Sequence, residues 1–307
     1  MTESTIPRTP GLSRRGLGLA LAGTAAAAAL PASLAATPAV AYEAGPDGLH
    51  QTVRLGVVGA VQTGGMFNQL LTAFQAESGY QVQVTPGMLD SLYGLARTGG
   101  LDIVISHLGT EQLQDFVTDR FGRWPQQILT TAFVFIAPPD DPADILGLDD
   151  AVEAFSRIAQ SQSPFIVNNL ASVLYLTDTL WHAAGTPDQQ GWYLDLGVSA
   201  AMAVQAARQR GGYTIWGLHP FLMFQQQQQS PMRAALYSDS LLQRVIASVV
   251  VHPGKVHGVN IAGALALERF LTRPSTQAQI RNFRLPAFNR PIFWSAAHHN
   301  DHGAEPG

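Results

Sequence analysis

The sequence predicts an α/β protein of two α/β lobes joined by two crossing strands. Strand-like segments alternate with helix-like segments after residue 50, and no repeat of about 20 to 50 residues is present. Two long apolar strands, 131–137 and 244–252, bracket a middle section, as in a chain that enters a second lobe and later returns. We therefore expect lobe one to combine residues 50–137 with 246–295, and lobe two to cover 138–245.

Each expected strand is a short apolar or alternating run, and each expected helix carries apolar residues three and four positions apart. Gly79 ends the first helix, Pro138 ends the strand 131–137, and Pro274 separates the last two helices. The five glutamines at 225–229 are expected to form a solvated loop. Strands are expected at 52–60, 80–85, 101–106, 131–137, 165–167, 212–216 and 244–252, and helices at 66–78, 92–97, 110–118, 149–159, 170–184, 199–210, 262–271 and 276–283.

Residues 1–41 have the features of an export leader. Arg14 and Arg15 precede a weakly apolar Ala/Gly/Leu run, and Ala39-Val40-Ala41 provides a small-x-small cleavage signal. Twin arginines before a mild apolar core are typical of a Tat signal peptide. An uncleaved membrane anchor is the alternative, but the Ala/Gly/Leu run is too weakly apolar to favour a stable transmembrane helix. We expect cleavage after Ala41, export to the periplasm, and no membrane anchor in the mature protein.

Composition excludes several classes of function. The 307-residue chain has a net charge of −4, which gives no basic footprint for nucleic acid. It contains no cysteine, so disulfides, thiol nucleophiles and thiolate metal sites are excluded. The sequence has no G-x-S-x-G, H-E-x-x-H, P-loop or strand-linked G-x-G-x-x-G motif. We therefore expect no catalytic residues and no cofactor.

The histidines give no clear metal site. His298, His299 and His302 lie beside Asp301, and such a cluster can bind a metal ion adventitiously. It follows the last periodic element, so we expect it to belong to a disordered tail, 296–307. His107 ends a buried strand and is expected to be a structural histidine with its hydrogen bonds satisfied.

The stretch 164–175 (PFIVNNLASVLY) is a short apolar strand that turns directly into a helix. Either Asn168 or Asn169 can cap that helix. The start of a helix favours an anion or another hydrogen-bond acceptor, because free backbone N–H groups point outward there. This turn is therefore the first candidate for a ligand site.

Several segments resemble the periplasmic tungstate-binding proteins of ABC importers, which are type II solute-binding proteins. Residues 97–107 (RTGGLDIVISH) and 131–145 (TAFVFIAPPDDPADI) carry the resemblance most clearly. The resemblance implies a type II periplasmic binding protein fold over nearly the whole mature chain. Further similar segments are 180–187, 192–195, 212–214 and 259–274.

The ligand-binding motifs of that family are largely replaced. Its hydroxyl-rich first-lobe loop falls on 57–61, which has no hydroxyl, and its later Thr-Asp-Arg motif falls on 216–220 without those residues. Its arginine-bearing turn falls on 167–175, where Asn168 replaces the arginine and Ser172 is retained. Neutral side chains and backbone groups at these turns become the candidate ligand-binding residues: Gly59, Ala60, Gln62, Thr63, Asn168, Asn169, Ser172 and Trp216.

The resemblance implies a solute-binding protein that serves an ABC permease and takes a small-molecule or oxyanion ligand. Because each asparagine can both donate and accept, a polar, largely uncharged ligand suits the site better than tungstate or molybdate. A compact dianion is nevertheless a second possible ligand, because backbone N–H groups can donate to its oxygens. A non-transport periplasmic accessory or interaction subunit with the same fold is the alternative, and an enzyme is the least supported reading.

Overall fold

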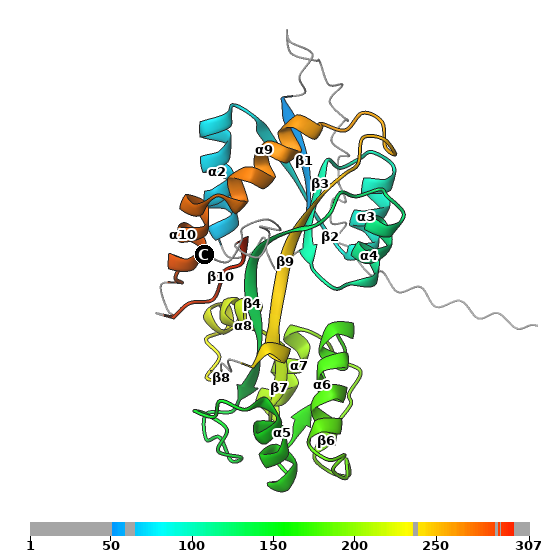
Figure 1. Cartoon of the computed structure of the whole chain (residues 1–307). Coiled ribbons are helices and arrows are strands. Elements are labelled where there is room, and N and C mark those ends of the chain that lie inside the picture. Colours follow the sequence, from blue (N-terminus) through cyan, green and yellow to red (C-terminus); the bar gives the residue numbers. More distant parts are fainter. Residues whose placement is uncertain (1–50, 59–64, 236–238, 286–287, 289, 298–307) are drawn as a thin grey trace, which may run out of the picture. The chain divides into compact units, whose positions relative to one another are not determined.

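The computed structural model describes residues 51–58, 65–235, 239–285, 288 and 290–297 (Figure 1). Its largest sheet is mixed, with the strand order β10-β4-β9-β3-β1-β2, and β7 and β8 also pair with β4. β1 is parallel to β2 and β3, whereas β9 is antiparallel to β3 and β4. The strands of this sheet are β1 Thr52–Val58, β2 Gln81–Gly87, β3 Ile103–His107, β4 Gln126–Ala137, β7 Thr214–Gly217, β8 Arg233–Ala235, β9 Gln243–Val250 and β10 Trp294–Ser295. β5 Phe165–Ile166 and β6 Tyr193–Leu194 form a separate parallel pair.

Helices follow most of the strands, so the predicted α/β class is confirmed. Asp150 accepts hydrogen bonds from the backbone N–H groups of Val152 and Glu153 and so caps α5. The 3₁₀ helix η1 spans Ser240–Leu242. The α-helices are α2 Met66–Ser78, α3 Leu89–Arg97, α4 Glu111–Thr118, α5 Ala151–Gln160, α6 Ala171–Ala183, α7 Ala201–Gln209, α8 Leu218–Gln228, α9 Ile261–Thr272 and α10 Pro274–Asn282.

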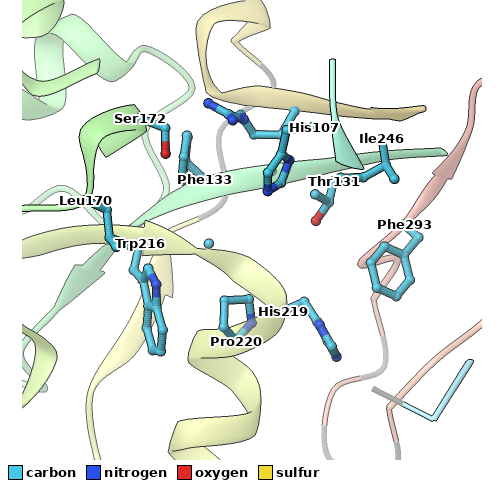
Figure 2. A pocket seen from close by; sticks show the side chains of 13 residues that line it. His107, Thr131, Phe133, Leu170, Ser172, Trp216, His219, Pro220, Ile246 and Phe293 are labelled. Carbon is cyan, nitrogen blue, oxygen red and sulfur yellow. The ribbon is translucent and has the colours of Figure 1, made fainter. Parts of the chain in front are cut away.

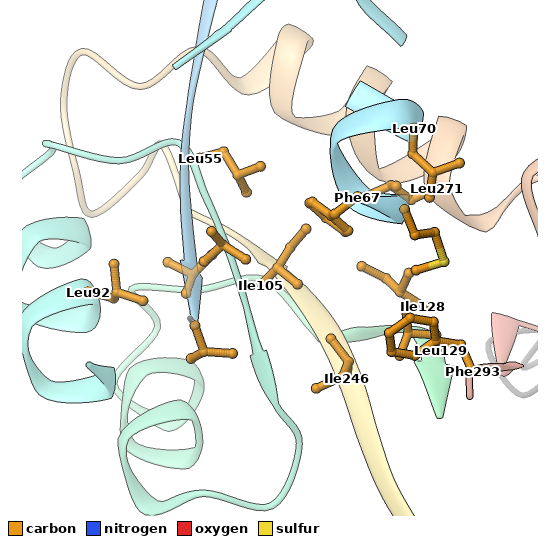
Figure 3. Packing of buried hydrophobic residues seen from close by; sticks show 14 of the residues in the cluster. Leu55, Phe67, Leu70, Leu92, Ile105, Ile128, Leu129, Ile246, Leu271 and Phe293 are labelled. Carbon is orange, nitrogen blue, oxygen red and sulfur yellow. The ribbon is translucent and has the colours of Figure 1, made fainter. Parts of the chain in front are cut away.

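β4 connects two groups of buried side chains. Its first half pairs with β9, from Gln126 to Ala132, and its second half pairs with β7 and β8, from Phe133 to Ala137. One hydrophobic cluster joins β1, β3 and β9 to α2 and α9, with Leu55, Phe67 and Ile105 among its members (Figure 3). A second cluster, built around Phe155, Phe165 and Trp192, packs against the second half of β4. The two long crossing strands of the prediction are thus present as neighbours, while the lobe boundaries at 137/138 and 245/246 stay a prediction.

Three local expectations are wrong. The glutamine tract is helical as far as Gln228, because glutamine is a good helix former and Gln225 also donates to the carbonyl of Met232 at 2.6 Å. Neither asparagine caps α6, whose N-cap is Leu170 without a side-chain hydrogen bond. Ala296 and Ala297, expected in a disordered tail, are buried, and their N–H groups donate to the Gln277 side chain.

Candidate ligand-binding pocket

A pocket lies where β4 exchanges its partner β9 for β7. On β9, Arg244 and Ile246 are two residues apart and therefore lie on one face of the strand. Arg244 is opposite Thr131 of β4, and Ile246 is opposite His107 of β3. Phe133, two residues beyond Thr131, is opposite Gly217 of β7. The strand register therefore brings together side chains that are far apart in the sequence.

Two helices begin at this pocket. Leu170 and Ser172 belong to the start of α6, and Gly217 and Pro220 to the start of α8. Neither helix has a side-chain cap, so the first N–H groups of both helices lack a capping acceptor side chain. The pocket has a volume of about 120 Å³. Its lining, most of which is labelled in Figure 2, consists of His107, Thr131, Ala132, Phe133, Leu170, Ser172, Trp216, Gly217, His219, Pro220, Arg244, Ile246 and Phe293.

Arg244 is the charged residue of this lining. Its guanidinium carbon lies 4.9 Å from the centroid of the Phe133 ring, which is a cation–π distance. Burial lowers the pKa of Arg244 below its ordinary value, but arginine stays protonated at neutral pH. Within the described part of the chain, Arg244 has no ion-pair partner. The pocket therefore contains a positive charge that no described carboxylate neutralises.

His107 lies beside this charge. Its Nδ1 atom is buried and has no hydrogen-bond partner among the residues described, so the expected satisfied structural histidine is not observed. Burial, and secondarily the charge of Arg244, lowers the pKa of His107 to about 4. At neutral pH the imidazole is therefore uncharged.

Of the candidate residues from the sequence, Ser172 and Trp216 line the pocket. The Ser172 hydroxyl and the Trp216 indole N–H have no hydrogen-bond partner within the described ranges, so both remain able to donate to a ligand. Four candidates, Gly59, Ala60, Gln62 and Thr63, lie outside the described residues, as do the tail histidines at 298–302.

Asn168 and Asn169 do not line the pocket. Asn168 is completely buried, donates from Nδ2 to the carbonyl of Ile215 at 2.9 Å, and accepts from the N–H of Ala200 at 2.8 Å. Asn169 donates to Asp195 and to the carbonyl of Val198. Both amides thus tie the turn before α6 to neighbouring segments. Their role as ligand donors stays a prediction.

The sequence pattern did not indicate Arg244 as a site residue, and it predicted a structural role for His107, which lines the pocket. A signal for Arg244 was present, since this charged residue begins one of the two long apolar strands that were expected to connect the lobes. The register that places Arg244 beside Phe133 and Thr131 could not be read from the sequence, because pairing between distant antiparallel strands has no local signature.

The donors of this pocket suit an acceptor group rather than a metal ion. Arginine, serine and indole groups, together with helix N-termini, all present hydrogen atoms. Among the described residues, no cluster of three or more His, Asp or Glu side chains is close enough to hold a metal ion.

None of the helices in the described residues has the length and apolar character needed to span a bilayer.

The model of the family described as "Bacterial extracellular solute-binding protein" matches residues 55–283, and the chain belongs to this family. The chain is 27% identical over 245 residues to the "Putative ABC transporter anion-binding protein" of Haloferax volcanii, covering 77% of this chain and 70% of that one. It is 21% identical over 238 residues to "Tungstate-binding protein TupA" of Peptoclostridium acidaminophilum, covering 75% of this chain and 80% of that one.

Among solved structures, the fold is similar to that of the tungstate-binding protein TupA from Desulfovibrio alaskensis G20. The TM-score is 0.71 at 21% sequence identity, over 80% of this chain and 99% of the other. The predicted type II periplasmic binding protein fold is confirmed by this similarity, as is the resemblance to the tungstate-binding family.

Proposed function

We propose that this protein is the receptor of an ABC importer for a small anion, which it binds in the pocket at Arg244. The observation that carries the proposal is a half-buried arginine that lines a small pocket without a described ion-pair partner. A buried charge is costly unless it is paired, so this arginine favours an anionic ligand. The names of the relatives in Haloferax volcanii and Peptoclostridium acidaminophilum support an anion as well.

The first turns of α6 and α8 add to this attraction. Helix N-termini carry partial positive charge and free N–H groups. Ser172 supplies a hydroxyl on α6, and Trp216 supplies an indole N–H directly before α8. The sequence favoured a largely uncharged ligand because Arg244 was not among the expected site residues. The position of Arg244 in the lining leads us to prefer an anion.

We further propose that the ligand has diverged from tungstate. The motif positions at 57–61, 167–175 and 216–220 lack the arginine of the tungstate-binding family and, apart from Ser172, its hydroxyls. Arg244 supplies a cation, but from β9 and not from those turns. We therefore expect tungstate to bind with micromolar or weaker affinity, because fewer charge-assisted hydrogen bonds surround it.

The test is isothermal titration calorimetry of the full-length protein with a panel of small anions that includes tungstate, sulfate, acetate and butyrate. Saturable binding of one of them with a stoichiometry near one supports the receptor role. If no member of the panel binds, the proposal fails. The non-transport accessory subunit, which the replaced motifs favour, then becomes the better account. A neighbouring permease gene would support the receptor function, whereas a neighbouring gene for a periplasmic oxidoreductase would support the accessory function.

A further inference from the structure

The charge of the pocket suits a ligand with a single negative charge. Arg244 is the one permanently charged side chain in the lining formed by the described residues, and that lining contains no aspartate or glutamate. His107 is buried beside it with no proton donor or acceptor bound to Nδ1 in the described chain. A dianion would place a second negative charge in a partly desolvated site where only the partial charges of two helix N-termini balance it, which is less favourable than binding a monoanion.

The walls of the pocket are mainly carbon. Phe133, Leu170, Trp216, Pro220, Ile246 and Phe293 account for much of the lining. A tetrahedral inorganic oxyanion presents acceptor oxygens in every direction, so several of them would face these side chains without a hydrogen bond. An acceptor that loses water without gaining a donor weakens binding. An organic anion avoids this cost, because its oxygens are at one end and its apolar body can contact the carbon walls.

The size of the pocket limits that apolar body. A dry cavity of about 150 Å³ lined by aliphatic and aromatic side chains is large enough for benzene. The volume of about 120 Å³ found here is somewhat smaller. A body of a few carbon atoms fits such a space, whereas drug-sized ligands occupy pockets of about 300–1,000 Å³.

From these three observations we infer that the ligand is a short-chain organic monoanion, such as a carboxylate of about three to five carbons. This inference rests on the proposed role as an anion receptor and makes the ligand class specific. In this arrangement the carboxylate is bound by Arg244 and the first turns of α6 and α8. The alkyl chain then contacts Trp216, Ile246 and Phe293.

The test compares acetate, propionate, butyrate and valerate with tungstate, sulfate and the neutral butyramide by calorimetry on the full-length protein. Each methylene that becomes buried should tighten binding about fourfold from acetate to butyrate, until the pocket is full. Butyramide has the shape of butyrate without its charge and should bind at least about tenfold more weakly.

A matched pair of variants tests the apolar wall. Trp216→Gln keeps an N–H donor at this position but removes the aromatic surface, so it should reduce the preference for butyrate over acetate. Trp124→Gln replaces a tryptophan that is 70% exposed and does not line the pocket, and it should leave the preference unchanged. Thermal unfolding of both variants checks that they are folded. An unchanged chain-length preference in folded Trp216→Gln would contradict the inference.

The possible results separate this inference from the proposed function. If tungstate or sulfate binds more tightly than every carboxylate, the organic ligand class is wrong but the anion receptor stands. If no anion binds, or if butyramide equals butyrate, the anion receptor itself is wrong. An affinity that rises along the carboxylate series, together with weak binding of the inorganic anions, supports both the anion receptor and the organic ligand class.

Discussion

The guanidinium of Arg244 lies over the ring of Phe133, with the guanidinium carbon 4.9 Å from the ring centroid. The two residues come from β9 and β4, whose pairing places Arg244 opposite Thr131. Phe133 is itself 7% exposed and packs in the second hydrophobic cluster, so its ring is held in place. A long, flexible side chain is thereby ordered before any ligand arrives, which lowers the entropy cost of binding.

We expect Phe133→Leu to weaken anion binding although it leaves the positive charge in the pocket. A cation–π contact contributes about 0.5–2 kcal/mol, so the dissociation constant should rise about 2- to 30-fold. Phe121→Leu is the matched control, because it removes a similar contact with Arg97, 4.5 Å away and outside the pocket. Calorimetric titration of both variants makes the comparison. Equal affinities of the two variants would mean that Phe133 does not order Arg244.

His107 should make the stability of the protein depend on pH. Burial lowers its pKa from the ordinary 6.5 to about 4, so the unfolded chain binds one more proton between these pH values. The stability from neutral His107 is complete above about pH 6.5 and is lost as the pH falls toward 4. The loss amounts to about 3 kcal/mol, since each pKa unit corresponds to about 1.4 kcal/mol.

Urea denaturation of wild type and His107→Gln at several pH values between 7 and 4 isolates this effect, because all other titrating groups are shared. We expect the unfolding free energy of wild type, minus that of His107→Gln, to decrease as the pH falls from 7 to 4. A difference that stays constant would show that His107 has an ordinary pKa.

The sequence predicted the alternation of strands and helices because apolar periodicity is a local property. It also predicted the turn before α6, including Ser172 and Trp216 as candidate site residues. It did not predict the intramolecular hydrogen bonds of the asparagines, since a polar side chain in a turn looks the same whether it contacts a ligand or a distant backbone. The partners of Asn168, at Ala200 and Ile215, lie 32 and 47 residues away, and no local rule specifies them. Arg244 was missed for the same reason.

We expect Asn168→Ala to reduce stability by about 2–3 kcal/mol, because it leaves the half-buried N–H of Ala200 and the buried carbonyl of Ile215 without this partner. Asn169→Ala should cost about 1 kcal/mol, since Asn169 is only half-buried and one of its acceptors is the exposed Asp195. Chemical denaturation measures both. The ligand role predicted from the sequence would be supported instead if Asn168→Ala kept its stability and lost anion binding.

Export by the Tat route is a separate prediction. Changing Arg14 and Arg15 together to lysine should block export, because that route depends on the twin arginines. Intact-mass measurement of the exported wild-type protein should show Tyr42 as the first residue. Normal export of the double variant, or a mature protein that begins elsewhere, would contradict the predicted leader.

We propose that Arg244 provides the charge that holds the ligand. The most direct test is calorimetric titration of Arg244→Gln with the tightest-binding anion of the panel, beside Arg208→Gln. Arg208 is exposed on α7 and does not line the pocket, so its replacement changes the net charge by the same amount. We expect Arg244→Gln to lose about 2–4 kcal/mol of binding free energy, roughly 30- to 1,000-fold in affinity, while Arg208→Gln binds as wild type does. Wild-type affinity in a folded Arg244→Gln protein would show that Arg244 does not hold the ligand.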